Sequence, residues 1–226
     1  MTLMRNHKIN HHPKAESLAD FAAGRVDEAS AVVVATHLTL CDGCKIAVGD
    51  FEAIGGAVLE TVAPVEMNNN ALREFWNRAD DDPITVQPIS MRPSNDFDLA
   101  ITQPLQRYLK GGIDDVNWRP VAPGLSQHVL DADGYRNGVL RLFKIMPGTQ
   151  IPAHSHKDSE FTLILRGSYE DELGSFGPGD FADLDHDDTH TPVASGDSPC
   201  ICLIAANAPL HFKSMIGKAI QPFIGL

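Results

Sequence analysis

The chain has 226 residues, enough to bury sizeable cores as one large or two small domains, and we expect two. Its 30 acidic and 18 basic residues give a formal net charge of -12, which argues against direct nucleic-acid binding and suits a basic partner. No stretch reaches the roughly 18 apolar residues of a membrane span, and the N-terminus lacks the apolar core of a signal peptide. We therefore expect a cytoplasmic protein whose reduced cysteines serve as metal ligands or redox groups rather than in structural disulfides.

Four helices are expected in the first part of the chain, because apolar residues recur there at helical spacing. Asp27 is placed to cap the second helix, and the third should end on the Gly55–Gly56 pair. The fourth carries an apolar stripe of Leu72, Phe75 and Trp76. We expect Trp76 to pack inside the protein, although a partner helix could bury the stripe instead. The expected helices cover residues 17–24, 27–41, 45–56 and 68–82.

A proline-rich stretch, residues 81–104, follows these helices and has the composition of a linker. Beyond Trp118, short apolar runs between Gly, Pro and Asp turns predict β-strands. The expected strands cover residues 138–145, 160–171, 179–184 and 199–205. Because helices come first and strands second, we expect a small all-α domain, residues 1–80, and a separate all-β domain, residues 105–226.

A histidine and two cysteines form a candidate metal site near the end of the second expected helix. If residues 27–41 are one helix, His37 and Cys41 lie one turn apart on the same face, with Cys44 just past the helix end. Tetrahedral zinc needs a fourth ligand. The N-terminal segment offers three candidates: His7, His11 and His12. A redox pair and simple packing of small buried side chains are the alternatives to zinc.

The spacing His-x-x-x-Cys-x-x-Cys on helices, with an upstream histidine, resembles the zinc-binding anti-sigma domain. The amino-acid sequence of residues 18–44 is similar to the N-terminal part of the ChrR group of anti-sigma factors. That resemblance implies that His12 is the fourth ligand of a structural Zn²⁺. It also implies that the helices clasp and inhibit an extracytoplasmic-function sigma factor. A closed site of four ligands leaves no position for a substrate.

The strongest local pattern is PGTQIPAHSHKDSEFTLILRG, residues 147–167, which matches the first cupin motif at each spaced position. His154 and His156 are two residues apart, so they project from the same side of a strand. Glu160 follows on the next strand or turn and is expected to point towards the same ion. The motif therefore predicts a double-stranded β-helix, or jelly-roll, barrel with a metal site.

The second cupin motif should supply one more histidine about one hairpin later. His190 follows the Gly179–Asp180 pair at the expected distance, whereas the spacing of His186 fits less well. Three histidines and one glutamate make a mixed site that suits zinc, iron, manganese or nickel. We expect a divalent transition metal, with zinc as the first choice. The alternative is a cupin-shaped barrel that has lost its metal.

A cupin barrel behind a zinc anti-sigma domain is the architecture of the ChrR group, and this resemblance covers nearly all of the chain. It implies a regulator that releases its sigma factor when the cupin domain responds to singlet oxygen or an organic hydroperoxide. Two other classes stay open: a metal-dependent cupin enzyme, such as a dioxygenase or isomerase with an accessory zinc domain, and a redox switch at Cys41 and Cys44. Cys200 and Cys202 should face the same side of a late strand, and we expect them to be packing residues.

Overall fold

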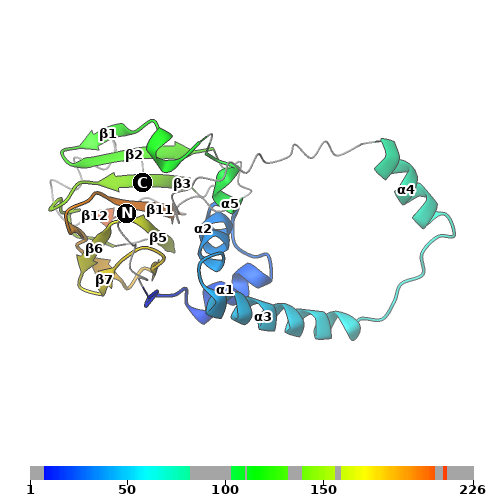
Figure 1. The fold of residues 1–226 in the computed structure, drawn as a ribbon. Coiled ribbons are helices and arrows are strands. Elements are labelled where there is room, and N and C mark those ends of the chain that lie inside the picture. Colours follow the sequence, from blue (N-terminus) through cyan, green and yellow to red (C-terminus); the bar gives the residue numbers. More distant parts are fainter. Residues whose placement is uncertain are drawn as a thin grey trace.

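A computed structural model describes residues 8–81, 103–109, 111–131, 139–155, 159–206 and 211–212. A helical part and a β-rich part lie side by side in Figure 1. The helices are α1 (Ala15–Ala22), α2 (Glu28–Leu38), α3 (Asp42–Glu60), α4 (Ala71–Asp81), α5 (Gln103–Gln106) and the 3-10 helix η1 (Ile113–Asp115). The strands are β1 (Arg119–Ala122), β2 (Leu125–Leu130), β3 (Val139–Ile145), β4 (His154–Ser155), β5 (Glu160–Arg166), β6 (Ser168–Asp171), β7 (Gly174–Phe176), β8 (Phe181–Leu184), β9 (Thr189–His190), β10 (Val193–Ser195), β11 (Cys200–Ala206) and β12 (His211–Phe212). The expected order of helices followed by strands is confirmed.

The second helix begins as predicted but ends early. Asp27 caps α2, because its side chain accepts a hydrogen bond from Ser30 N at 3.0 Å. The helix ends at Leu38, so the prediction that it extends to Cys41 is wrong. Cys41 instead caps the next helix, where its Sγ accepts from Cys44 N at 3.5 Å. Cys41 therefore marks the start of α3, whereas the sequence pattern placed it at the end of the second helix.

The third helix is longer than predicted at both ends. α3 begins at Asp42 and continues through Gly55 and Gly56 to Glu60, so the prediction that the glycine pair ends it is wrong. A glycine costs a helix about 1 kcal/mol relative to alanine, but it stops the helix only where it takes up a left-handed conformation. Neither of these two glycines has a positive φ angle. The helix therefore passes through them.

The fourth helix lies away from the rest of the molecule in Figure 1. Leu72, Phe75 and Trp76 form its apolar stripe as predicted, and Trp76 is 57% exposed. The expectation that Trp76 packs inside the protein is therefore wrong, because α4 is not packed against the other described elements. Its apolar face is open to solvent.

α2 is the central helix of the molecule. Most of its residues are buried, and they lie on all sides of the helix, so it is covered all round. α1 and α3 contact one side of it, while β3, β5 and β11 lie against another. Val33 of α2 belongs to the same buried apolar cluster as Leu163 of β5 and Leu203 of β11. The helical part and the sheet therefore share a core.

In the described residues, the β-rich part, called the barrel below, consists of a six-stranded antiparallel sheet and two three-stranded sheets. The strand orders are β1-β2-β3-β11-β5-β8, β10-β6-β7 and β12-β4-β9. In β5 and β11, Leu163 and Leu203 face the helices, whereas Ile164 and Cys202 face a second apolar cluster inside the barrel. Because both faces are buried, these strands read as nearly continuous apolar runs.

The strand predicted over residues 160–171 is in fact two strands, β5 and β6. Gly167 separates them with a φ angle of +71°, which favours glycine. A Cβ atom at this position would also collide with the backbone carbonyl of Pro199. The other three predicted strands correspond to β3, β8 and β11.

Residues 9–14, the N-terminal arm, have no regular secondary structure and run beside β8. Phe181 N donates to His11 O at 3.1 Å, and Lys14 N donates to Asp183 Oδ2 at 2.8 Å. Lys14 Nζ also pairs with Asp185 Oδ2 at 2.8 Å. The first residues of the described chain therefore contact the barrel before α1 begins.

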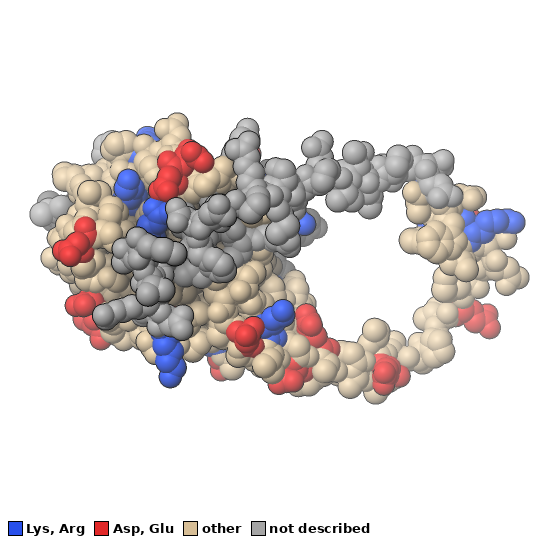
Figure 2. Space-filling model, in the orientation of Figure 1, with Lys and Arg blue, Asp and Glu red and all other residues tan. Residues whose placement is uncertain are grey.

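Negative charge is concentrated on α3. Acidic side chains follow α3 in Figure 2, where Asp42, Asp50, Glu52 and Glu60 accompany a single basic residue, Lys45.

Among the described residues, no helix combines the length and the apolar character that crossing a membrane requires.

Candidate metal centres

Four ligand-type side chains converge where the N-terminal arm meets α2 and α3. They are His12, His37, Cys41 and Cys44, and one ligand atom of each lies within 4.8 Å of the others. His37 Nε2 lies 3.3 Å from Cys44 Sγ, and His12 Nδ1 lies 3.5 Å from Cys41 Sγ. Bond lengths of about 2.0 Å to nitrogen and 2.3 Å to sulfur place tetrahedral zinc ligands about 3.3–3.8 Å apart. The separations in this first cluster fit that geometry.

The side chains of the first cluster come from four different local structures. His12 lies on the N-terminal arm, His37 in the last turn of α2, Cys41 at the cap of α3 and Cys44 in its first turn. The prediction that His37 and Cys41 share one helix face is wrong, because α2 ends between them. The two residues still converge, because the chain turns after α2 and begins α3 at once.

The barrel fixes the orientation of the His37 ring. The side chain is fully buried, and its Nδ1–H donates to the carbonyl oxygen of Gly179 at 3.0 Å. The lone pair of Nε2 therefore faces the sulfur atoms. Burial lowers the pKa of His37 to about 4, so the ring is neutral at physiological pH. A neutral imidazole is the form that binds a metal ion.

Cys44 does not ionise readily on its own. Burial and the contact with Cys41 raise the pKa of the Cys44 thiol to about 12. A bound dication would reverse this effect, because it stabilises the thiolate form. His12 Nδ1 also lies 3.4 Å from Cys44 Sγ, so both sulfurs are close to the His12 imidazole. Neither a redox pair nor simple packing needs these imidazole contacts.

The arm places His12, rather than its neighbour, in the first cluster. The ring of His11 points towards the barrel and stacks on Phe176, with ring centroids 4.1 Å apart. The third candidate for the fourth ligand, His7, lies outside the described residues. Of the two described candidates, only His12 therefore has a ring nitrogen beside the sulfurs.

A second cluster lies in the β-rich part and contains His154, Glu160 and His190, whose ligand atoms also lie within 4.8 Å of one another. His154 of β4 and His190 of β9 are direct partners in the antiparallel ladder, and Glu160 begins β5. All three side chains are buried. His156, the remaining ligand expected from the first cupin motif, lies outside the described residues.

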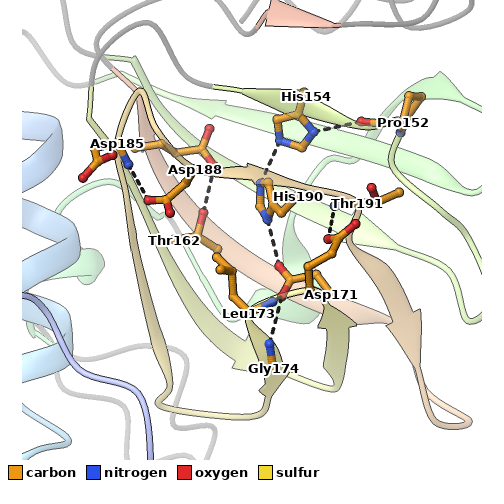
Figure 3. Close-up of polar contacts among 12 residues, drawn as sticks. Pro152, His154, Thr162, Asp171, Leu173, Gly174, Asp185, Asp188, His190 and Thr191 are labelled. Atoms are coloured by element: carbon orange, nitrogen blue, oxygen red, sulfur yellow. Dashed lines mark hydrogen bonds and ion pairs between the residues drawn. The ribbon is translucent and has the colours of Figure 1, made fainter.

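Each histidine of the second cluster directs a lone pair at the other (Figure 3). His154 Nδ1–H donates to Pro152 O at 2.9 Å, and His190 Nδ1–H donates to Asp171 Oδ2 at 2.8 Å. The two Nε2 atoms are left facing each other at 3.0 Å. Two lone pairs at this distance repel unless a proton or a cation lies between them. The buried Glu160 carboxylate nearby makes the donor set suitable for a divalent cation.

His186, the alternative to His190, lies elsewhere. Its side chain is exposed, and its Nε2 lies 3.4 Å from Asp187 Oδ1. Together with Asp185 these residues form a separate acidic group on the surface. His186 is therefore not part of the second cluster.

Cys200 and Cys202 are free, buried and on the same side of β11, inside the barrel. The contact with Cys200 and burial raise the pKa of the Cys202 thiol well above its ordinary value. A protonated, inaccessible thiol reacts slowly, so these features agree with a packing role.

Three supporting residues were not found by sequence reasoning: Asp171, Gly179 and Asp180. Asp171 orients His190, the carbonyl of Gly179 orients His37, and Asp180 accepts hydrogen bonds from the N-terminal arm. The Gly179–Asp180 pair was recognised only as a landmark for spacing. These roles depend on contacts between distant parts of the chain, which no local pattern reveals.

Comparisons with known proteins agree with the architecture. A model of the ChrR cupin-like domain matches residues 109–209. The anti-sigma-E factor ChrR of Cereibacter sphaeroides is 38% identical over 215 residues, which cover 95% of this chain and 98% of that protein. The crystal structure of Rhodobacter sphaeroides SigE in complex with the anti-sigma ChrR includes a chain with a TM-score of 0.73 and 35% identity, and the match covers 88% of this chain and 99% of that chain.

These relationships span both the helical and the β-rich part, so the resemblance stated from the sequence and the expected fold class are confirmed. They also support a regulator rather than an enzyme. The chain belongs to the ChrR family of anti-sigma factors.

Proposed function

We propose that this protein binds and inhibits an extracytoplasmic-function sigma factor through α3 and α4. The observation that carries the proposal is a series of apolar side chains on these helices, each more than half exposed. They are Ile46, Ile54, Val58 and Leu59 on α3 and Leu72, Phe75 and Trp76 on α4. Single exposed apolar residues are normal, whereas several exposed apolar residues along one helix are typical of a surface that binds another protein.

The shape and charge of the two helices support this partner. Leu72, Phe75 and Trp76 recur at helical spacing, as in helices that lay an apolar face into a groove of their partner. The acidic side chains along α3 suit a basic protein such as one that contacts DNA. A relative of the chain, ChrR, has been crystallised in complex with SigE.

We infer that the first cluster binds one Zn²⁺ through His12 Nδ1, His37 Nε2 and the sulfurs of Cys41 and Cys44. When bound, the ion supplies a cross-link between the arm, α2 and α3 and contributes to the folding free energy of the helical part. The side chains hold their donor atoms at suitable separations, and the Gly179 carbonyl orients one of them. The four donors close the site, so its role is structural.

We propose that the barrel is the half that receives the signal and that it binds a divalent transition metal, zinc as the first choice, through His154, His156, Glu160 and His190. By family resemblance the signal is singlet oxygen or an organic hydroperoxide, and the response is release of the sigma factor. A cytoplasmic location follows from the sigma factor partner. The division into residues 1–80, a linker over 81–104 and residues 105–226 stays part of this proposal.

Co-purification tests the proposal. The full chain is co-expressed with an extracytoplasmic-function sigma factor from the same genome, and zinc is measured in the complex. We expect a one-to-one complex that contains zinc, and loss of both zinc and complex in the double variant His37→Ala, Cys41→Ala. His186→Ala, which changes an exposed histidine outside both clusters, should leave the complex intact. A chain that carries metal only in the barrel and forms no complex would contradict the proposal.

A further inference from the structure

The N-terminal arm delivers the one exposed ligand of the first cluster. His12 is exposed, whereas His37, Cys41 and Cys44 are buried and belong to helices or a helix cap. The arm has no regular secondary structure, so its residues would lose conformational entropy on being ordered. Something outside the cluster must therefore hold His12 in place.

The contacts that hold the arm centre on one buried carboxylate. Asp180 is fully buried at the start of β8. Its Oδ1 accepts from Asn10 N at 2.7 Å and from His11 N at 3.0 Å, and its Oδ2 accepts from Gly177 N at 2.8 Å. Hydrogen bonds to an ionised acceptor are roughly twice as strong as those between neutral groups. The carboxylate thus fixes the two residues that immediately precede His12.

Side-chain packing fits the arm to the same turn of the barrel. Ile9 lies over Gly179, whose φ angle is +90° and where a Cβ atom would come within 2.8 Å of the Ile9 side chain. Two residues after Ile9, the His11 ring stacks on Phe176. The turn between β7 and β8 is therefore shaped to receive the arm.

The same turn reaches a second ligand of the first cluster. Gly179 O accepts from His37 Nδ1, and the adjacent Asp180 holds the arm next to His12. Two consecutive barrel residues thus support both histidines of a cluster whose ligands all come from the helical part and the arm. Residues that orient metal ligands in this way typically change metal affinity ten- to a hundredfold when mutated.

We propose that Asp180 is the positioning residue through which the barrel holds His12 in the first cluster, so that the barrel sets how tightly this cluster retains zinc. The inference rests on the proposed zinc site. It means that the β-rich part directly contacts and positions the first cluster, which cross-links the helices. A displacement of the turn between β7 and β8 would be transmitted to His12 through the two hydrogen bonds of the arm.

The test is the rate at which zinc passes from the full-length protein to a chromogenic chelator. In Asp180→Asn, an NH2 donor replaces one acceptor oxygen and the negative charge is lost, so at least one of the three N–H groups loses its partner and the remaining hydrogen bonds become weaker. We expect zinc transfer from the first cluster to become about ten- to a hundredfold faster. Asp114→Asn is the control, because it removes a carboxylate of η1 that pairs with Arg166 of β5 rather than with the arm. It should release zinc at the wild-type rate.

A second variant leaves the carboxylate and the barrel turn unchanged. Asn10→Pro removes one N–H donor from the exposed part of the arm, and we expect faster zinc transfer in this variant as well. The protein loaded with Co²⁺ gives an additional readout, because the visible d–d bands report the ligand set. The spectrum of Asp180→Asn should shift towards that of His12→Ala, which a merely structural role of Asp180 would not cause.

The outcomes separate this inference from the proposed function. Wild-type protein that binds no zinc in the first cluster would overturn the zinc site itself. Wild-type protein that binds zinc, with Asp180→Asn and Asn10→Pro releasing it at the wild-type rate and an unchanged Co²⁺ spectrum, would overturn only the role of Asp180. Faster release and a shifted spectrum in both variants, with Asp114→Asn unchanged, would support it.

Discussion

His12 Nδ1 lies 3.4 Å from Cys44 Sγ, although 32 residues separate the two in the sequence. The neighbouring His11 ring stacks on Phe176 instead. We therefore predict that His12→Ala lowers the zinc affinity of the first cluster by about a hundredfold or more, because it removes a ligand rather than a supporting group. Competition with a chelator of known affinity measures the change.

His11→Ala is the matched control for this prediction, because it changes the adjacent histidine on the same arm. It removes the stack on Phe176 but no ligand, so zinc affinity should fall far less than in His12→Ala. The opposite order, with His11→Ala the more damaging change, would show that the arm binds the ion in another register.

A second prediction concerns the hydrogen bond between Asp171 and His190. The carboxylate fixes the ring so that Nε2 points at His154. Asp171→Asn weakens this contact and leaves the ring less firmly oriented, so we expect the barrel to bind its divalent ion about ten- to a hundredfold more weakly. The measurement is a zinc competition titration in a Cys41→Ser, Cys44→Ser background, which confines tight binding to the barrel.

Glu172→Gln provides the comparison for Asp171→Asn. Glu172 is the next residue along the chain, and its Oε2 accepts from the backbone N of Thr191 without touching either histidine. Its substitution should leave the metal affinity of the barrel unchanged. Equal losses in the two variants would mean that negative charge, and not the orientation of His190, matters.

A third prediction concerns α4. Trp76 is exposed in the free protein, so Trp76→Ala should leave its stability unchanged. In the complex, the loss of a buried tryptophan typically costs about 2 kcal/mol, which corresponds to roughly thirtyfold weaker binding. Titration calorimetry with the purified sigma factor and urea unfolding of the free protein measure the two quantities.

Asn77→Ala changes the side of α4 opposite to Leu72, Phe75 and Trp76, and it should bind the sigma factor as the wild type does. If Trp76→Ala binds normally while the free protein loses stability, the tryptophan packs within this chain, and the docking role of α4 is wrong.

Local patterns were sufficient to predict most of the secondary structure. Asp27 was identified as a cap because its side chain competes for nearby N–H groups, which is a local property. The buried strands were predicted because Leu203 and Cys202 are apolar on alternate faces of one strand. The end of α3 was predicted wrongly, because a glycine pair ends a helix only if it takes up a left-handed conformation. Here the residues beyond Gly56 continue the helix.

The clusters were predicted better than their supporting groups. His37, Cys41 and Cys44 were grouped by residue type and spacing, and their side chains do converge, even though the assumed single helix was wrong. Asp171 and Asp180 were not recognised, because an acidic residue has the same local appearance on a solvated loop and beside a buried histidine. Only the pairing of β6, β7 and β8 with distant segments gives these two carboxylates their partners.

The last prediction concerns the stability of the metal-free protein at mildly acidic pH. Burial lowers the pKa of His37 to about 4, whereas the unfolded chain takes up this proton near pH 6.5. Between these values the unfolded state binds more protons than the native state, so the free energy of unfolding falls as the pH is lowered from 6.5 to 4. The stability that the neutral His37 ring contributes is fully present above pH 6.5. The shift of the His37 pKa between the unfolded and the native state corresponds to a loss on the order of 3 kcal/mol in the free energy of unfolding.

Urea unfolding of the chelator-treated protein at pH 7 and pH 4.5 measures this loss, and His37→Gln isolates the part that belongs to one ring. Glutamine carries no titrating group, so the stability of the variant should depend less on pH over this window than that of the wild type. The carboxylates of the barrel titrate in both proteins and cancel in the comparison. If the two proteins lose the same free energy between pH 7 and 4.5, protonation of His37 does not limit the acid stability of the core that α2 shares with the sheet.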